Sequence, residues 1–129
     1  MQGKPKGERA KPPGLVKAYF ANGQLESVGR YVAGKRHGPW KFYLRNGNLK
    51  AWGRLVAGQY EGMWKWNAEN GTLRQWGPFK DGQQHGIWTR CFGGTGVVCD
   101  KGLWNHGKRI GLWKFYGKDG QLKRTKTFH

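Results

Sequence analysis

Acidic residues, cysteine, serine and long apolar runs are all scarce in this sequence. Only 7 Asp and Glu stand against 24 Lys and Arg in 129 residues, so the net charge is +17. A surface of this sign attracts nucleic acid, an anionic membrane or an acidic protein. Two cysteines are too few for a disulfide-rich secreted scaffold. Because Ser27 is the only serine and the few carboxylates form no acid–base pair, an enzyme is the least favoured class.

The scarcity of apolar runs also bears on where the protein resides. No run of about 18 apolar residues could span a bilayer, and no apolar signal-peptide core follows Met1. We therefore expect a protein of the cytoplasm or another intracellular compartment.

Residues 1–14 combine four basic residues with three prolines and three glycines, a composition that disfavours regular structure. They predict a flexible basic arm ahead of one domain of residues 15–129.

What the sequence has in abundance is a repeat of about 24 residues. Four tryptophans mark it: Trp40, Trp64, Trp88 and Trp113. Two sets of glycines recur with them, namely Gly34, Gly58, Gly82 and Gly107, and Gly38, Gly62, Gly86 and Gly111. A turn dipeptide also recurs, as Asn22-Gly23, Asn46-Gly47, Asn70-Gly71 and Asp119-Gly120. A fixed period of this size indicates a stacked repeat architecture. Such architectures mostly offer extended surfaces to partners.

The Asn-Gly pairs lie between alternating runs, which predicts β-hairpins closed by two-residue type I′ turns. Pairing outward from residues 46–47 sets Leu44 opposite Leu49 and Trp40 opposite Gly53. A glycine opposite a tryptophan lets the indole lie flat across the neighbouring strand. We predict an all-β fold, a single-layer antiparallel meander of β-hairpin repeats with about nine strands. Its core aromatics are Trp40, Phe42, Trp64, Trp66, Trp88 and Trp113.

One copy of the repeat shows the spacing best. It runs through Gly38, Trp40, Tyr43, Asn46-Gly47, Leu49, Gly53, Leu55, Gly58 and Gly62. This spacing resembles the MORN repeat (membrane occupation and recognition nexus) in its variant form, over residues 15 to about 126. The resemblance implies the hairpin meander. Similar repeats occur in scaffolds, phospholipid-binding segments, domains attached to enzymes and bacterial proteins labelled antitoxins by association. The resemblance therefore implies no catalytic residues.

The fourth repeat departs from this pattern, because residues 94–96 (Gly-Thr-Gly) replace Asn-Gly. A three-residue loop there puts Arg90 opposite Asp100, which we expect to be a structural ion pair. It also puts Cys91 opposite Cys99, a placement that allows a disulfide; two reduced thiols are the favoured alternative. Two cysteines without further ligands make a poor zinc site, and no metal or cofactor is expected.

The face opposite the core carries the candidate site. Its predicted nucleic-acid-binding residues are Lys17, Arg30, Lys35, Arg36, Lys41, Tyr43, Arg45, Lys50, Trp52, Arg54, Lys65, Arg74, Trp76, Lys108, Arg109, Lys114, Tyr116 and Lys123. Cations contact phosphates, and aromatic rings stack on unpaired bases. RNA is favoured over DNA because no helix is predicted that could enter a major groove. We predict a non-catalytic, RNA-binding component of a larger ribonucleoprotein assembly, with no small-molecule substrate.

Two other classes stay open. A protein scaffold or adaptor, including an antitoxin-like binder of a partner protein, would use exposed Trp52, Trp76 and Tyr60 as anchors. A module for anionic phospholipid would use the clustered Lys and Arg. Lysine beside tryptophan is also an ordinary cross-strand pair on a solvated sheet face.

Overall fold

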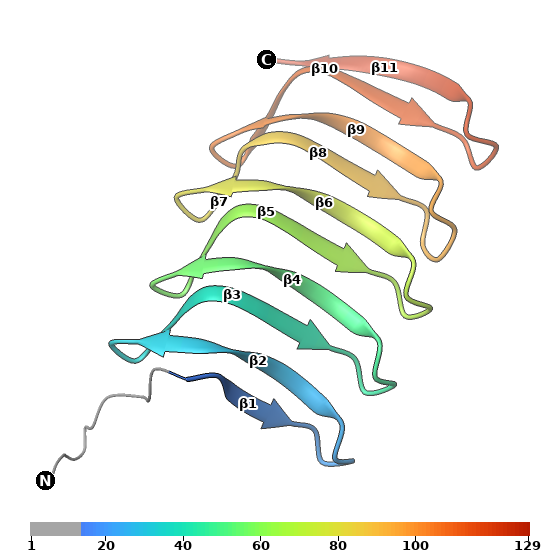
Figure 1. Cartoon of the computed structure of the whole chain (residues 1–129). Coiled ribbons are helices and arrows are strands. Elements are labelled where there is room, and N and C mark those ends of the chain that lie inside the picture. Colours follow the sequence, from blue (N-terminus) through green and yellow to red (C-terminus); the bar gives the residue numbers. More distant parts are fainter. Residues whose placement is uncertain (1–13) are drawn as a thin grey trace, which may run out of the picture.

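The computed structural model describes residues 14–129, which form one open antiparallel sheet built as a stack of hairpins (Figure 1). The strands are β1 (Val16–Tyr19), β2 (Leu25–Val32), β3 (Lys35–Tyr43), β4 (Leu49–Val56), β5 (Gln59–Asn67), β6 (Leu73–Lys80), β7 (Gln83–Gln84), β8 (Gly86–Cys91), β9 (Val98–Asn105), β10 (Lys108–Tyr116) and β11 (Leu122–Phe128). Of the predicted basic arm, residues 1–14, only Gly14 lies within the described residues. No helix in the described part could cross a bilayer.

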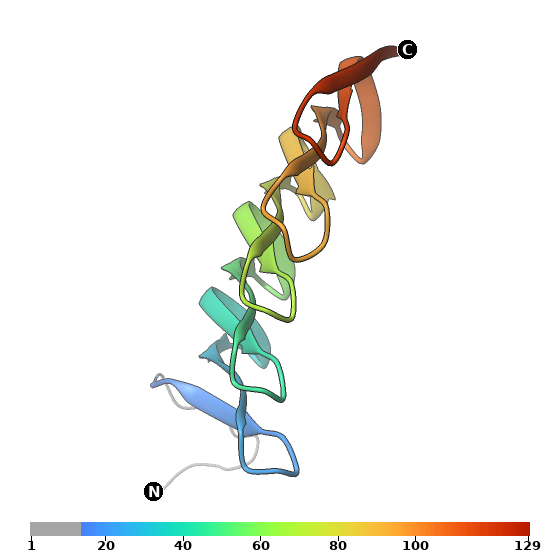
Figure 2. The same ribbon diagram turned by 90° about the vertical axis from the view of Figure 1, so that its right-hand side faces the viewer.

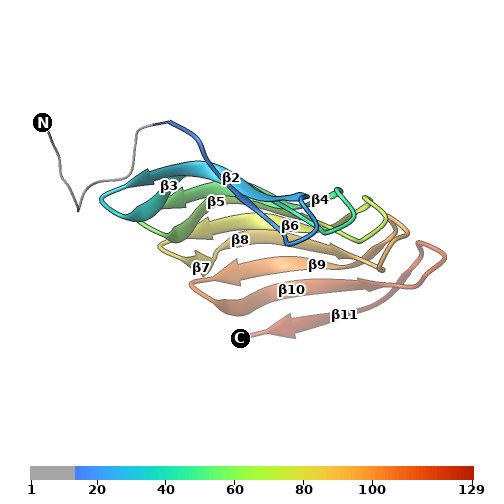
Figure 3. The same ribbon diagram turned by 90° about the horizontal axis from the view of Figure 1, so that it is seen from below.

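Apart from β7 and β8, which both pair with β6, strands that are neighbours in the sequence are neighbours in the sheet, so the predicted all-β meander is confirmed. The predicted number of about nine strands is too low, because the sheet has 11. A break at His85 separates β7 from β8, and β11 pairs with β10 along its whole length. Figure 3 shows the hairpins side by side in chain order.

Each hairpin is bent along its length, as the view in Figure 2 shows. The register of β2 with β3 shifts between Val28 and Arg30, close to Gly38, whose φ is 89°. A β-bulge of this kind bends the strand, and glycine adopts this φ without steric cost. The bend brings side chains from the outer parts of the hairpins, such as Tyr31 and Arg36, over a core tryptophan, here Trp40.

Each core tryptophan lies against a glycine of the preceding hairpin. A Cβ built at Gly53 would come within 2.3 Å of the Trp64 ring, and Trp64 Nε1 donates a hydrogen bond of 2.8 Å to the Arg54 carbonyl. The same contact joins Gly29 to Trp40, Gly77 to Trp88 and Gly102 to Trp113. All four indoles are at most 2% exposed, so each buries its ring and still satisfies its only donor.

The predicted register is confirmed here, but the predicted partner of each indole is wrong. Trp40 is opposite Gly53 in the pairing of β3 with β4, as the sequence predicts. Its ring, however, lies over Gly29 on β2, and Gly53 receives Trp64 instead. The contact therefore links successive hairpins rather than the two strands of one hairpin.

The core is a single layer of rings on one face of the sheet, which we call the tryptophan face. Trp40, Trp64, Trp88 and Trp113 are buried, as predicted, whereas Phe42 and Trp66 are half-buried and pack against them. Rings from the bent parts of the hairpins meet the indoles edge-on; Tyr31 and Trp40, for example, have centroids 5.4 Å apart. Edge-to-face pairs of this kind are favourable.

The predicted two-residue turns are wrong at the hairpin tips. The Leu44 N–H donates to the Asn48 carbonyl and the Gly47 N–H to the Leu44 carbonyl, which closes a three-residue loop. Of the three loop residues only Gly47 has a positive φ, 93°, because Asn46 Oδ1 accepts the Asn48 N–H at 2.8 Å and holds an Asx turn. Lys50 is then an extra residue in a β-bulge that restores the predicted register.

We predict that Gly53→Ala destabilises the protein by about 1–3 kcal/mol, the cost of overpacking, because the new methyl group would displace the Trp64 indole. Gly93→Ala is the matched control, since a Cβ there meets nothing within 4 Å; it should change the free energy of unfolding by less than about 0.5 kcal/mol. Urea unfolding of both variants measures the difference. Equal stability of the two variants would contradict the contact.

Candidate nucleic-acid interface

One row of side chains crosses the whole sheet on the face opposite the tryptophans. Side chains alternate along a strand, so the residue after each buried tryptophan points to this side. Successive cross-strand partners form the lysine row, which consists of Lys17, Val28, Lys41, Trp52, Lys65, Trp76, Thr89, Lys101, Lys114 and Thr125. With strands ~4.8 Å apart, it spans roughly 43 Å.

The lysine row carries positive charge without a carboxylate. Lys17, Lys41, Lys101 and Lys114 are exposed, and Lys65 is half-buried. Within residues 14–129 the one ion pair joins Arg90 to Asp100 on the tryptophan face. The ammonium groups of the row are therefore not neutralised by neighbouring carboxylates of the described chain.

The sequence predicts most of this row. The alignment of Lys17, Lys41, Lys65 and Lys114 at one repeat position is confirmed by the pairing, as are the pairs Lys41–Trp52 and Lys65–Trp76. Lys101, which lies between Thr89 and Lys114, was missed. The register that places Arg90 opposite Asp100 also places Lys101 in the row. The predicted three-residue loop itself is wrong, because the Phe92 N–H donates to the Val97 carbonyl and closes a loop of residues 93–96.

Arg36 and Arg109 are not part of this surface, contrary to the prediction. The Arg36 guanidinium lies 4.8 Å from the centroid of the Trp40 ring, and that of Arg109 lies 4.8 Å from the Trp113 ring. Arg36 is paired with Tyr31, which already packs on Trp40. Alternation along β3 and β10 thus sends both arginines over the core, where they cover the indoles by cation–π contact.

Lys50 and Arg74 also depart from the prediction, because they are the extra residues of their β-bulges. Tyr43 is opposite Leu49 rather than Lys50, and Asn67 is opposite Leu73 rather than Arg74. Lys123 is likewise the extra residue in the bulge of the last hairpin. The bulges therefore remove these three cations from their predicted places opposite Tyr43, Asn67 and Tyr116.

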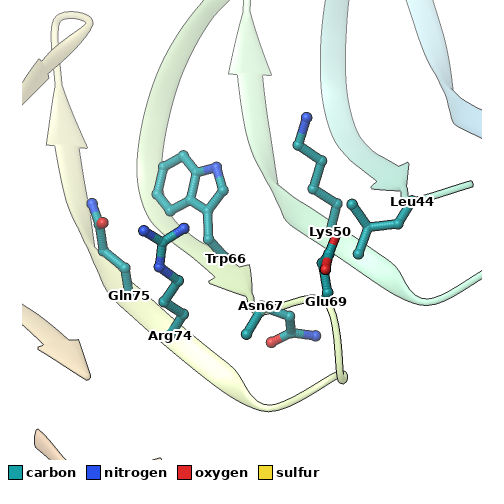
Figure 4. A pocket seen from close by; sticks show the side chains of 8 residues that line it. Leu44, Lys50, Trp66, Asn67, Glu69, Arg74 and Gln75 are labelled. Atoms are coloured by element: carbon teal, nitrogen blue, oxygen red, sulfur yellow. The ribbon is translucent and has the colours of Figure 1, made fainter. Parts of the chain in front are cut away.

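A hollow of about 370 Å³ lies beside two of these cations (Figure 4). Its lining comprises Leu44, Lys50, Trp66, Asn67, Ala68, Glu69, Arg74 and Gln75. Figure 4 shows the Arg74 side chain beside the Trp66 indole. Since Trp66 belongs to the tryptophan face, Lys50 and Arg74 border that face near the hairpin tips.

The remaining predicted residues lie around the lysine row. Arg30, Arg54, Tyr43 and Tyr116 are two residues along their strands from Val28, Trp52, Lys41 and Lys114, and so share the outer face. Lys35 and Lys108 are opposite Val32 and Asn105 at the turns between hairpins. Arg45 lies at a hairpin tip, its guanidinium 5.0 Å from the Phe20 ring.

A second row runs beside the lysines and was not predicted. The residue between the bend glycine and the core tryptophan is Pro39, Met63, Ile87 or Leu112, and these define the apolar row. Met63, Ile87 and Leu112 are 50%, 57% and 56% exposed. Leu103 is opposite Ile87 and joins the patch. The sequence could have shown this row, because the residue before each core tryptophan is apolar in four repeats, although the alternation of side chains directs it toward solvent.

The ion pair Arg90–Asp100 is confirmed. Arg90 Nε donates to Asp100 Oδ1 at 3.1 Å and Nη2 donates to Oδ2, while Asp100 is only 2% exposed. The hydrogen bond with Asp100 raises the pKa of Arg90 above its ordinary value, so this side chain stays charged at any physiological pH.

The histidines do not form a metal centre in the described chain. The rings of His85 and His106, from successive turns, have centroids 4.8 Å apart, a contact that the repeat positions did not predict. Within residues 14–129 there is no group of three His, Cys, Asp or Glu that could hold a metal ion.

The two cysteines are free thiols, so the alternative of a disulfide is not realised. A register shift after Arg90 pairs Cys91 with Val98 rather than with Cys99. Burial, and then the charge of Cys99, raise the pKa of the Cys91 thiol.

The sequence model of the family described as MORN repeat variant matches residues 12–33, 36–51 and 109–129. These segments include most of the first hairpin, β3 with the tip that follows it, and the last hairpin. No curated protein matches this chain.

We predict that iodoacetamide modifies Cys99 before Cys91. Cys91 is 8% exposed, and its raised pKa leaves less of the reactive thiolate at about pH 8. The protein is labelled for timed intervals without a reductant, and mass spectrometry of its tryptic peptides measures the modification rate of each cysteine. Protection of both thiols until a reductant is added would instead indicate a disulfide.

Proposed function

We propose that this chain, which belongs to the MORN repeat family in its variant form, is a non-catalytic protein. It binds RNA through the lysine row, as a component of a larger ribonucleoprotein assembly. The observation that carries the proposal is the alignment of five lysines across the sheet without a carboxylate among them. A solvated row with only a structural role would mix both signs of charge, whereas on this face Glu61, which is opposite Arg54, lies outside the row.

The spacing of the lysines suits a flexible polyanion. Lys17, Lys41 and Lys65 are each two strands apart, about 10 Å, and Lys101 and Lys114 are on adjacent strands. Each lysine that contacts a phosphate releases condensed counterions, and this release supplies most of the affinity of sequence-independent binding.

Aromatic rings lie between the lysines. Trp52 is paired with both Lys41 and Lys65, and Trp76 with Lys65 and Thr89. Both indoles are half-buried, so part of each ring is accessible to an unpaired base. Stacking of a base on an aromatic side chain contributes about 1–3 kcal/mol. An open sheet with rings and cations on one face suits single-stranded RNA rather than a duplex groove.

Binding of a single-stranded RNA should show the salt dependence of five phosphate contacts. With about −0.7 per phosphate, log K against log salt should have a slope of about −3.5, so affinity falls by roughly 100-fold between 50 and 200 mM salt. Lys41→Gln with Lys65→Gln should make the slope shallower by about 1.4. Fluorescence anisotropy with a labelled oligoribonucleotide measures both slopes.

The matched control is Lys80→Gln with Lys118→Gln, which removes the same charge from exposed positions outside the row. It should weaken binding less and alter the slope less than the double variant in the row. Equal effects of the two double variants would mean that net charge alone, and not the lysine row, binds the RNA.

The apolar row favours a second candidate, an anionic membrane surface. Exposed Met63, Ile87 and Leu112 could enter the boundary between head groups and acyl chains while the adjacent lysines meet anionic head groups. Bases and phosphates, by contrast, make no use of exposed aliphatic side chains.

Ile87→Gln with Leu112→Gln separates the two candidates. Both side chains are more than half exposed, so folding should be unaffected and RNA affinity unchanged within about twofold, since surface changes are small in energy. Sedimentation with vesicles of phosphatidylserine and phosphatidylcholine shows whether the unaltered protein binds lipid. Strong vesicle binding that this double variant abolishes would favour the membrane over RNA.

A further inference from the structure

The column of rings on the tryptophan face is interrupted in the fourth hairpin. From Tyr31 to Trp88 the rings are in continuous contact; the Trp66 and Trp88 centroids, for example, are 6.0 Å apart. A second group joins Trp104, Trp113 and Phe128. Among the described residues no ring contact connects the two groups. The interruption lies between Trp88 and Trp113, on neighbouring repeats.

The interruption arises from substitutions at two repeat positions. Where earlier hairpins have Phe42 or Trp66, the fourth has Arg90, and where the second has Ala51, the fourth has Asp100. Asp100 is nearly fully buried. A buried carboxylate is costly even when it is paired, so an aromatic residue opposite a small one, as in Phe42 with Ala51, would stabilise the core better.

The substituted positions border a cavity of about 250 Å³. Its lining consists of Gln75, Gln84, Trp88, Arg90, Asp100, Trp104, Arg109 and Trp113. Three indoles form apolar walls, and two guanidinium and two carboxamide groups supply hydrogen-bond donors. Apolar walls with a few convergent polar groups are typical of small-ligand sites.

Both arginines have donors to spare. Asp100 engages Arg90 through Nε and Nη2, which leaves three of the five guanidinium N–H groups of a side chain that is 50% exposed. The Arg109 guanidinium carbon lies 5.8, 4.8 and 5.4 Å from the centroids of the Trp104, Trp113 and Phe128 rings. This cation–π contact uses none of its five N–H groups as hydrogen-bond donors. No carboxylate of the described residues pairs with Arg109.

We propose that this cavity is a binding site for a small aromatic anion, a flat ring that bears one phosphate or carboxylate group. The charges of Arg90, Arg109 and Asp100 sum to one positive charge, which attracts such an anion. The anionic group accepts hydrogen bonds from Arg90 and Arg109, a strong charge-assisted arrangement. The ring lies in the cavity between the two groups of rings and packs against Trp104, the half-buried indole of the lining, since Trp88 and Trp113 are each only 2% exposed. This site is on the face opposite the lysine row and is independent of RNA binding.

The test is a titration of the full chain, followed by NMR of the Gln75 and Gln84 side-chain amides and the indole N–H groups. The probes are phenyl phosphate, benzoate, uridine 5′-monophosphate, inorganic phosphate and neutral benzamide. We expect saturable shifts with aromatic anions, at least about tenfold tighter for phenyl phosphate than for inorganic phosphate or benzamide. A preference for uridine 5′-monophosphate over phenyl phosphate would identify a nucleotide as the source of the anion, and the reverse a simple aryl acid.

Two variants test the residues. Arg109→Gln should weaken phenyl phosphate binding at least about tenfold, the loss of a charged hydrogen bond; Arg36→Gln, at the same repeat position over Trp40, should leave it unchanged. Arg90→Phe with Asp100→Ala restores the residues of the second hairpin, Phe42 and Ala51, and should fold and lose binding because the new ring fills the cavity. Equal losses for Arg36→Gln and Arg109→Gln, retained binding in the restored variant, or no saturable shift with any aromatic anion would overturn the proposal.

Discussion

The fold depends on one contact, in which a tryptophan ring lies on a glycine of the preceding hairpin. Any Cβ at that glycine would occupy the space of the indole, and the indole nitrogen reaches the next carbonyl of the same strand. Since a single-layer sheet has no second layer to cover it, these rings are its core. β11 differs from β2, β4, β6 and β9, because it carries Lys126 opposite Trp113, at the position where those strands have the glycine that receives the next tryptophan.

The same contact aligns the opposite face. Since every hairpin is held to the previous one at the same position, the residues that follow the tryptophans fall into register over the whole sheet. A repeated lysine thereby becomes a continuous row, and a repeated apolar residue becomes a second row. The two faces thus differ in character. The face with the lysine row presents a charged, extended surface. The tryptophan face carries a column of rings that is interrupted in the fourth hairpin, where the Arg90–Asp100 pair replaces a ring.

Much of this arrangement could be predicted from the sequence, because the period and the alternation of side chains are both local rules. They correctly place Trp40 opposite Gly53, Lys41 opposite Trp52 and Arg90 opposite Asp100. They fail at the hairpin tips, where an Asx turn at Asn46 replaces the two-residue turn and shifts Lys50 into a bulge. Nor does spacing show which of two neighbouring strands an indole covers, since this depends on the bend of the hairpin. The placement of Arg36 and Arg109 was open to prediction, because alternation from Trp40 and Trp113 puts both on the tryptophan face.

The central claim is that the lysine row is the surface that meets RNA. Ultraviolet cross-linking of the full chain to a uridine-rich oligoribonucleotide, with the cross-linked peptides mapped by mass spectrometry, tests it most directly. The account predicts cross-links at Trp52, Trp76 or the residues beside them on β4 and β6. Cross-links confined to the tryptophan face or the hairpin tips, or none at a salt concentration at which RNA binds, would contradict it.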